Sequence, residues 1–402
     1  MRYFLSETAV LKWLEIPTVY DVKRDELYEI DDVAFVFLKQ CATPEGCAGE
    51  TDKAFLDYCI SEGVLTTEPV IVKRPPLIKS PWPSLRYLEL QITDRCNLQC
   101  RHCYIGKPGN NELAVNEIKR VLDEFEVMQG LRLLITGGEP LMHRHFKEFN
   151  SLLSRYHFRK ILLTNGLLLN ADIFDTLNVD EIQLSIDGME HGHDSLRGKG
   201  TYNKVVQKAG DALAMGFDVS VATMVHSDNL EEFDQMGSLF RRMGVKDWTV
   251  DVPLISGNLM DNLILSVPPE IAGKYLNYGF GGGIHGGGET FACGFHLLCV
   301  TVNGSICKCG FFSRDQIGTL GDGLLGSWKK VRPLKLAELE CADLACNFIE
   351  ECRGGCRYRA SISPENLRRE KLHEVIRGSG RDIYKCYAYG IINSGGEDPS
   401  QL

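Results

Sequence analysis

Between residues 86 and 256, short apolar runs alternate with longer amphipathic stretches, and this alternation constrains the fold more than any other feature. Six runs have the length of buried strands, at 87–92, 131–135, 160–163, 181–186, 218–224 and 247–252. Stretches with helical spacing lie between them, such as 115–128, 202–215 and 230–243. Successive βα units give parallel strands with right-handed crossovers. The sequence therefore predicts an α/β fold whose centre, residues 86–275, is a partial (β/α)6 TIM-like barrel with its chemistry at the carboxyl ends of the strands.

Segments of different composition flank this repeat. Five prolines between residues 68 and 84 predict an extended linker over 71–85, because proline fixes φ and restricts the residue before it. Upstream, short strands followed by two amphipathic helices predict a winged-helix-like module over residues 1–70. Downstream, a run of glycines predicts a hinge over 276–292, and a cysteine-rich, weakly periodic domain follows over 293–402.

Charge and hydropathy narrow the class of protein. The 402 residues carry 44 Lys+Arg against 54 Asp+Glu, a net charge of -10, which argues against a surface that follows nucleic-acid phosphates. No apolar run approaches the roughly 18 residues that span a bilayer. We therefore expect a cytoplasmic protein without a nucleic-acid or membrane partner. Because disulfides seldom persist in that compartment, the 15 cysteines indicate metal or cluster ligation.

The first cysteine cluster directly follows the first barrel strand. Cys96, Cys100 and Cys103 lie within eight residues, so they can surround one soft metal centre while leaving one coordination position open. A structural zinc site would require a fourth ligand nearby, and His102 is squeezed between two of the thiols.

Four motifs in register resemble the radical S-adenosylmethionine (radical SAM) superfamily. The CxxxCxxC run has an aromatic-type residue before its last cysteine. The other three, Gly-Gly-Glu-Pro at 137–140, Thr-Asn-Gly at 164–166 and Ser-Ile-Asp-Gly at 185–188, end the second, third and fourth strands. The resemblance implies a 4Fe-4S cluster on the three thiols, whose open iron binds the amino and carboxylate groups of S-adenosylmethionine. Reduction of this pair would generate a 5'-deoxyadenosyl radical.

The same resemblance implies a set of cofactor-binding residues: His102, Gly137, Gly138, Glu139, Asn165, Ser185 and Arg197. The glycines allow backbone to approach the methionine moiety, and the carboxylate of Glu139 suits its ammonium group. Ser185 would contact the ribose or carboxylate end and Arg197 the carboxylate, while the backbone of His102 would lie near the adenine. Ser185 could instead simply end a strand, and Arg197 could be a solvated loop charge.

The cysteines beyond the barrel resemble the SPASM domain, which holds two auxiliary iron-sulfur clusters. Carried over by position, one cluster would use Cys293, Cys299, Cys309 and Cys356. The other would use Cys346, Cys352, Cys386 and one further ligand. The family's first cysteine of that element is Asp343 here, and Cys341 lies two residues away. We favour Asp343 as the fourth ligand, with Cys341 or an open or incomplete cluster as alternatives. The remaining thiols, Cys41, Cys47, Cys59 and Cys307, suit buried apolar positions.

The N-terminal module resembles the precursor-peptide recognition elements of peptide-maturing enzymes. The leading hypothesis is therefore a radical SAM/SPASM maturase that modifies a ribosomally made peptide, with a thioether or carbon-carbon cross-link as the product. The precursor would bind the N-terminal module, and flavodoxin or ferredoxin would supply electrons. Alternatives are a small-molecule or tetrapyrrole substrate, and a non-catalytic electron carrier. The general base stays open among Asp251, Glu289 and Asp343.

Overall fold

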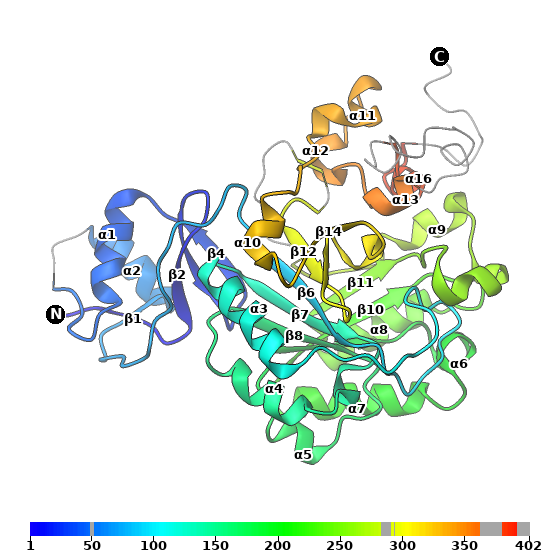
Figure 1. Cartoon of the computed structure of the whole chain (residues 1–402), viewed down its shortest axis with the longest axis horizontal. Coiled ribbons are helices and arrows are strands. Elements are labelled where there is room, and N and C mark those ends of the chain that lie inside the picture. The colour runs from blue at the N-terminus through cyan, green and yellow to red at the C-terminus, as the bar shows by residue number, and fades with distance from the viewer. Residues whose placement is uncertain (49–51, 283–290, 293, 362–379, 392–402) are drawn as a thin grey trace.

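The computed structural model describes residues 1–48, 52–282, 291–292, 294–361 and 380–391 (Figure 1). Its centre is a nine-stranded sheet in the order β11-β10-β9-β8-β7-β6-β12-β13-β14. The first six positions hold the expected parallel strands: β6 (Tyr87–Thr93), β7 (Arg132–Gly137), β8 (Arg159–Thr164), β9 (Glu181–Ser185), β10 (Asp218–Met224) and β11 (Asp247–Asp251). Neighbours in sequence are neighbours in space, which confirms the predicted α/β fold with a partial barrel.

Six helices lie between these strands along the described chain: α3 (Val115–Val127), α4 (Phe146–Leu153), α5 (Ala171–Phe174), α6 (Glu190–Arg197), α7 (Tyr202–Ala214) and α8 (Phe233–Met243). A further helix, α9 (Pro269–Tyr275), follows β11. In α3, the fully buried residues Ile118, Leu122 and Phe125 recur at helical spacing and join the core with strand residues such as Leu90. Three short 3-10 segments, η1 (Pro140–Met142), η2 (Gly257–Asp261) and η3 (Leu263–Leu265), border the carboxyl ends of the strands.

The N-terminal unit has two small sheets and two helices. Strands β2 (Ala9–Trp13), β3 (Pro17–Asp21) and β4 (Glu26–Glu29) form an antiparallel sheet, and β1 (Phe4–Leu5) pairs with β5 (Leu65–Thr66). The helices are α1 (Asp32–Cys41) and α2 (Lys53–Ser61), whose first turns are capped by the side chains of Asp31 and Asp52. The unit has its own apolar core, in which Cys41, Cys47 and Cys59 are buried.

Buried charges attach this unit to the amino-terminal ends of the barrel strands. Arg159, the first residue of β8, donates to the carbonyls of Val22 (3.1 Å) and Lys23 (2.7 Å). Arg132, the first residue of β7, pairs with Asp25 at 2.6 Å. The N-terminal unit therefore lies at the end of the barrel opposite to the carboxyl ends of its strands.

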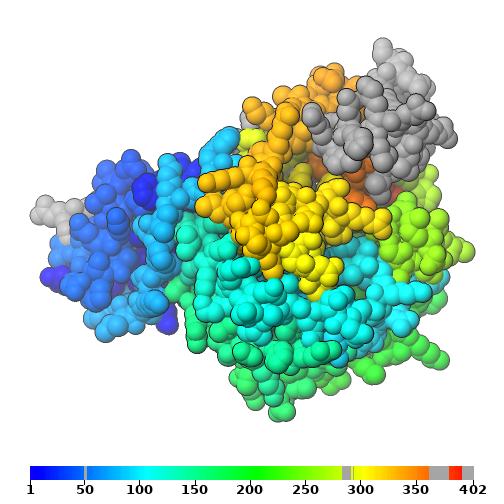
Figure 2. Space-filling model, in the orientation of Figure 1, coloured from blue at the N-terminus to red at the C-terminus, as the bar shows by residue number. Residues whose placement is uncertain are grey.

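The central sheet continues past the barrel, which the sequence did not indicate. Strand β12 (Leu297–Val300) pairs in parallel with β6, and β13 (Ser305–Cys307) and β14 (Gln316–Thr319) extend it antiparallel. Figure 2 shows this segment, in yellow, lying directly against the barrel. The 3-10 segment η4 (Gly310–Phe312) lies between β13 and β14. Short helices follow β14: α10 (Gly323–Trp328), η5 (Leu336–Glu338), α11 (Glu340–Asp343), α12 (Ile349–Cys352), α13 (Arg357–Ser361) and α16 (Ile383–Ala388).

No helix in the described part of the chain is both long and apolar enough to cross a membrane.

Candidate functional site

The three thiols of the CxxxCxxC loop meet at one cavity. Cys96, Cys100 and Cys103 follow β6 and line a cavity of about 320 Å³ at the carboxyl ends of the strands. Asn258, at the start of η2, fixes the loop from the opposite side, because its backbone N–H donates to the Cys103 carbonyl and its amide to the Cys100 carbonyl, both at 2.9 Å. The Leu98 N–H donates to the Cys96 sulfur at 3.4 Å.

Gly137 and Gly138 have no room for side chains beneath this loop. A Cβ on Gly137, which has φ 135°, would lie 2.2 Å from the Thr93 carbonyl oxygen, and one on Gly138 would lie 2.3 Å from the Arg95 carbonyl oxygen. Both glycines line the cavity. Any side chain here would displace the backbone that carries the thiols, so the glycines set the position of the loop.

Glu139 is fully buried and fixes the neighbouring turn. Its carboxylate accepts hydrogen bonds from the Thr164 hydroxyl (2.8 Å) and from the Asn165 (2.9 Å) and Leu141 (3.2 Å) backbone N–H groups. A carboxylate has about four acceptor positions, so one is left after these three. Contact with a ligand ammonium group stays a prediction, and the structure adds that Glu139 holds two strand ends together.

Asn165 and Ser185 line the cavity as the sequence motifs suggested. The Asn165 amide donates to the side chain of Asn97 at 2.8 Å and lies 4.0 Å from the Cys96 sulfur. Ser185 is half-buried at the end of β9. Their proposed contacts with S-adenosylmethionine stay predictions.

Arg197 is not a solvated loop charge, because only 11% of its side chain is exposed. Its guanidinium forms an ion pair with the fully buried Asp187, and its Nη1 lies 3.8 Å from the Cys100 sulfur. Burial alone would raise the pKa of Asp187, but the opposing charge of Arg197, with other neighbours, lowers it to about 2. A fixed positive charge therefore stands beside a thiol that must become a thiolate to bind iron.

His102 lies behind the same loop. The residue as a whole is half-buried, yet its Nδ1 atom is fully buried and has no hydrogen-bond partner among the described residues. Burial, assisted by the charge of Arg197, lowers the pKa of His102 to about 3, so the ring is neutral at physiological pH. The neutral ring adds no further positive charge beside the thiols.

The donor set fits a 4Fe-4S cluster. In such a cluster each thiolate binds a different iron, so the ligands stand apart around a shared cavity. Cys96, Cys100 and Cys103 lie in this way around a cavity whose wall includes the backbone of Gly137 and Gly138.

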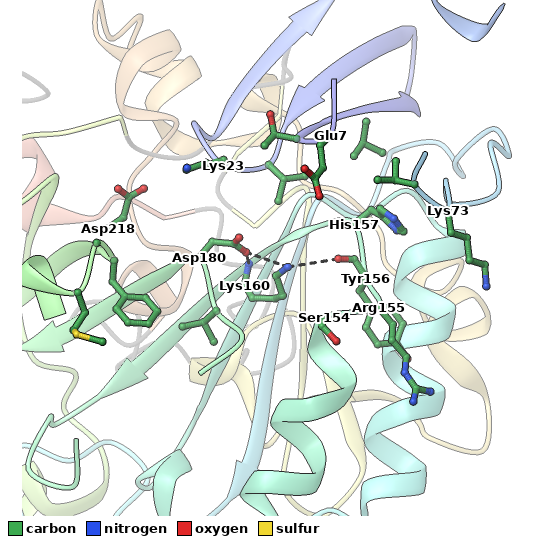
Figure 3. Close-up of a pocket in the computed structure, with 18 residues that line it drawn as sticks. Glu7, Lys23, Lys73, Ser154, Arg155, Tyr156, His157, Lys160, Asp180 and Asp218 are labelled. Carbon is green, nitrogen blue, oxygen red and sulfur yellow. Dashed lines mark hydrogen bonds and ion pairs between the residues drawn. The ribbon is translucent and has the colours of Figure 1, made fainter. Parts of the chain in front are cut away.

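A second cavity, of about 760 Å³, lies between the N-terminal unit and the amino-terminal ends of the barrel strands (Figure 3). No cysteine lines it, and Lys160 inside it already pairs with Asp180 at 3.3 Å. The chemistry of the thiols is therefore confined to the opposite end of the barrel.

The first predicted auxiliary set lies beside β6. Cys299, on β12, is fully buried and pairs in register with Cys307, whose sulfur lies 3.6 Å from the Ser313 carbonyl oxygen. Cys309 and Cys356 are half-buried, and both lie near the Tyr358 ring. Cys293 lies outside the described residues. Assignment of this set to a cluster stays a prediction.

The second predicted set contains Cys346, Cys352 and Cys386, of which Cys386 is buried and the other two are half-buried. Asp343, the favoured fourth ligand, is exposed at the end of α11. Cys341, on the same helix, is 7% exposed and packs in the apolar cluster that Cys346 joins. The structure thus brings Cys341, rather than Asp343, into the buried region beside Cys346.

Sequence reasoning missed three residues near the cavity. Asp187 belongs to a recognised motif, but only the fold shows that it holds Arg197. Glu89 and Gln91 are polar residues at alternate positions of an otherwise apolar strand, a signal that could have placed them on the inner face of the barrel. Glu89 accepts hydrogen bonds from the Gly310 N–H (2.8 Å) and the Tyr104 hydroxyl (3.3 Å), so it links the cysteine loop to η4.

The candidate general bases are not equivalent. Asp251, the last residue of β11, forms an ion pair with Arg359 of α13 at 2.6 Å. Glu289 lies outside the described residues, and Asp343 is exposed. No base is assigned.

Comparisons with known proteins agree with this geometry. Residues 90–240 match the model of the Radical SAM superfamily. The chain is 25% identical to the mycofactocin maturase MftC of Mycolicibacterium smegmatis over 317 residues, which covers 67% of this chain and 77% of the relative. It is 26% identical to the AdoMet-dependent heme synthase of Nitratidesulfovibrio vulgaris over 207 residues, 49% of this chain and 56% of the relative.

Among solved structures, Streptococcus suis SuiB bound to the precursor peptide SuiA has a similar fold. The TM-score is 0.65 at 14% identity, and the match covers 90% of this chain and 97% of that chain. The motifs, the thiol cavity, the matching family model and the shared fold agree. Residues 90–240 therefore form a radical SAM domain, and the cofactors of such a domain are a 4Fe-4S cluster and S-adenosylmethionine.

Proposed function

We propose that this chain is a peptide maturase. When bound, the cluster and S-adenosylmethionine supply a 5'-deoxyadenosyl radical, which abstracts hydrogen from a carbon of a ribosomally synthesised precursor peptide. The product is an oxidative modification such as a thioether or carbon-carbon cross-link. The mycofactocin maturase relatives and the peptide-bound SuiB structure support this choice of substrate class.

The observation that carries the proposal is a groove continuous with the thiol cavity. It has a volume of about 770 Å³ and shares Tyr104, Lys107 and Phe311 with the cavity lining. One wall comes from the loop after Cys103 and from η2, and the other comes from the chain around η4. An extended peptide lying along this groove would bring one residue into the cavity while its neighbours contact the walls.

The groove walls suit peptide side chains. Phe311, Phe312 and Tyr358 give an aromatic surface, and the exposed cations Lys107 and Arg314 stand beside it. Aromatic rings recognise apolar and aromatic side chains, and cations pair with carboxylates or with a peptide C-terminus. We therefore expect the modified segment to carry an aromatic or apolar residue near an acidic one.

The leader would bind the N-terminal unit at β4. The other edge strand, β2, is covered by the linker, because the Ser80 N–H donates to the Trp13 carbonyl (2.8 Å) and Arg74 donates to the Ala9 carbonyl (2.6 Å). Strand β4 pairs only with β3 among the described strands. An exposed edge of this kind accepts an extended peptide as an additional strand.

The proposed contact between the leader and β4 can be tested at Glu29. The Ile30 N–H donates to the Pro17 carbonyl, so by the alternation of an antiparallel ladder the N–H of Glu29 faces away from β3. Glu29→Pro removes that outward donor at an edge position that tolerates proline, and Glu29→Ala is the matched control. Anisotropy of a labelled precursor with the full chain should show weaker binding for Glu29→Pro only. Equal affinity of both variants and the parent would contradict leader binding at β4.

The reaction itself is tested anaerobically with the cluster-loaded full chain, S-adenosylmethionine, dithionite and the peptides encoded beside its gene. We expect 5'-deoxyadenosine together with a peptide that has lost two hydrogens. The triple variant Cys96→Ala/Cys100→Ala/Cys103→Ala is the control and should give neither product.

A tetrapyrrole substrate is the second candidate, favoured by relatives named heme synthase and Fe-coproporphyrin III synthase. Turnover of an iron porphyrin in the same assay, with every peptide unchanged, would replace the peptide proposal by this one.

A further inference from the structure

Four thiols of the C-terminal region gather around the short helix α11. Cys341 lies in α11 and is 7% exposed, packed with Leu336 and Leu339 in a small apolar cluster. Cys346 packs against that cluster, and its N–H donates to the Cys341 carbonyl at 3.1 Å. The turn between the two cysteines therefore holds both of them at this apolar cluster.

The two remaining thiols approach the same place from other helices. Cys352 ends α12, and Ile349 of the same helix packs against the apolar cluster that contains Cys341. Cys386 lies in α16, which is held beside α12 because the Phe348 and Tyr389 rings pack with centroids 5.5 Å apart and the Cys356 N–H donates to Asp382 at 2.7 Å. The elements that carry the four thiols therefore pack against one another.

Positive charge stands beside this group of thiols. Arg357 is 1% exposed and meets Leu339, a member of the Cys341 cluster, beside Gly354. Arg381 forms an ion pair at 3.6 Å with Glu340, the residue before Cys341. Cations next to several thiols suit a site where the thiols bind metal as thiolates, because the cations offset part of the negative charge.

Asp343 is turned away from the thiols. It lies two residues after Cys341, which is about 200° around an α-helix, and it is exposed. Since Cys341 faces the buried cluster, Asp343 on the opposite side of the same turn faces solvent. For Asp343 to replace Cys341, α11 would have to rotate by more than half a turn and expose the Cys341 side of the helix.

We infer that Cys341 is the fourth ligand of an auxiliary iron-sulfur cluster, together with Cys346, Cys352 and Cys386. Each thiol loses its proton on binding iron, so four protons leave as the cluster is bound. A cluster with four thiolate ligands has no open iron. The substrate therefore does not bind at this cluster, whose role is to transfer electrons, and the assignment holds whichever substrate the enzyme modifies.

The test counts iron and sulfide in the full chain. The background is Cys96→Ala/Cys100→Ala/Cys103→Ala, which leaves only the auxiliary clusters, about eight irons if both are present. Into this background we place Cys341→Ala or, as the matched control two residues away, Asp343→Ala. We expect Asp343→Ala to keep about eight irons, and Cys341→Ala to fall to about four to seven, with a changed electron paramagnetic resonance spectrum.

A second variant distinguishes the loss of one iron ligand from a general loss of structure. If Cys341→Ala loses all its iron, Cys341→Ser, which keeps the side-chain size and offers an oxygen ligand, is expected to retain iron with an altered spectrum. Iron loss in Asp343→Ala with retention in Cys341→Ala would overturn the assignment. Unchanged iron and spectra in both Cys341 variants would do the same. No peptide enters these measurements, so their failure is distinct from failure of the proposed function.

Discussion

The buried pair of Asp187 and Arg197 gives a prediction whose size follows from the structure. Asp187→Asn keeps the shape of the side chain but removes the charge that faces Arg197 in a fully buried position. Removing one partner of a buried ion pair costs about 3–5 kcal/mol, because the other charge stays buried without compensation. We expect the free energy of unfolding at pH 7 to fall by that amount.

The same pair predicts a pH dependence with a definite sign. Burial alone would raise the pKa of Asp187, but the charge of Arg197, with other neighbours, lowers it from 3.8 to about 2, which corresponds to roughly 2–3 kcal/mol of stabilisation. Because the folded-state pKa is the lower one, this stabilisation is complete above pH 5 and is lost as the pH falls through 4 towards 2. The difference in free energy of unfolding between the parent and Asp187→Asn should therefore shrink by roughly 2–3 kcal/mol over that range.

Urea unfolding of the metal-free chain, followed by circular dichroism and tryptophan fluorescence, measures both quantities. The fluorescence reports on the barrel, because Trp248 lies in its core at 1% exposure. Glu190→Gln removes the same charge at an exposed position of α6, the helix that carries Arg197; it is the matched control and should stay within about 0.5 kcal/mol of the parent. Equal effects of the two substitutions, or a difference that does not vary with pH, would refute the reasoning.

Three further predictions concern the site and the groove. Gly138→Ala should displace the cysteine loop, because the added Cβ would lie 2.3 Å from the Arg95 carbonyl oxygen. The iron bound per chain should therefore be lower than in the control Gly210→Ala, where an added Cβ meets nothing within 4 Å. Phe312 lines the groove but not the thiol cavity. Phe312→Ala should therefore raise the KM for peptide at least severalfold, with a smaller change in kcat. A large fall in kcat with an unchanged KM would contradict the placement of the peptide in the groove. Finally, the proposed sites for leader and core lie at opposite ends of the barrel strands, and a strand such as β6, with 7 residues, is about 23 Å long. An extended peptide needs about seven residues to span that length. Precursors with a shorter segment between leader and core should therefore bind but stay unmodified.

Much of the barrel and of its site could be predicted because both depend on local patterns. Strand and helix positions follow from periodicity, and Cys96, Cys100 and Cys103 follow from spacing alone. The partners that fix the site could not be predicted, because Asp187 holds Arg197, and Asn258 holds the cysteine loop, only through the tertiary fold.

The C-terminal region was the hardest to predict, for a physical reason. Its strands have three or four residues, too few for a period-two pattern, so the continuation of the sheet through β12 was not visible in the sequence. The preference for Asp343 over Cys341 came from counting positions along the chain. Position along the chain does not show which side of α11 is buried. In the structure Cys341 is buried and Asp343 is exposed.

The transfer of hydrogen from peptide to cofactor tests the central claim most directly. A precursor peptide deuterated at its side-chain carbons is incubated anaerobically with the loaded enzyme, S-adenosylmethionine and dithionite, and the 5'-deoxyadenosine is analysed by mass spectrometry. The account predicts deuterium in 5'-deoxyadenosine in proportion to a peptide that has lost two hydrogens. Unlabelled 5'-deoxyadenosine beside unchanged peptide would contradict it.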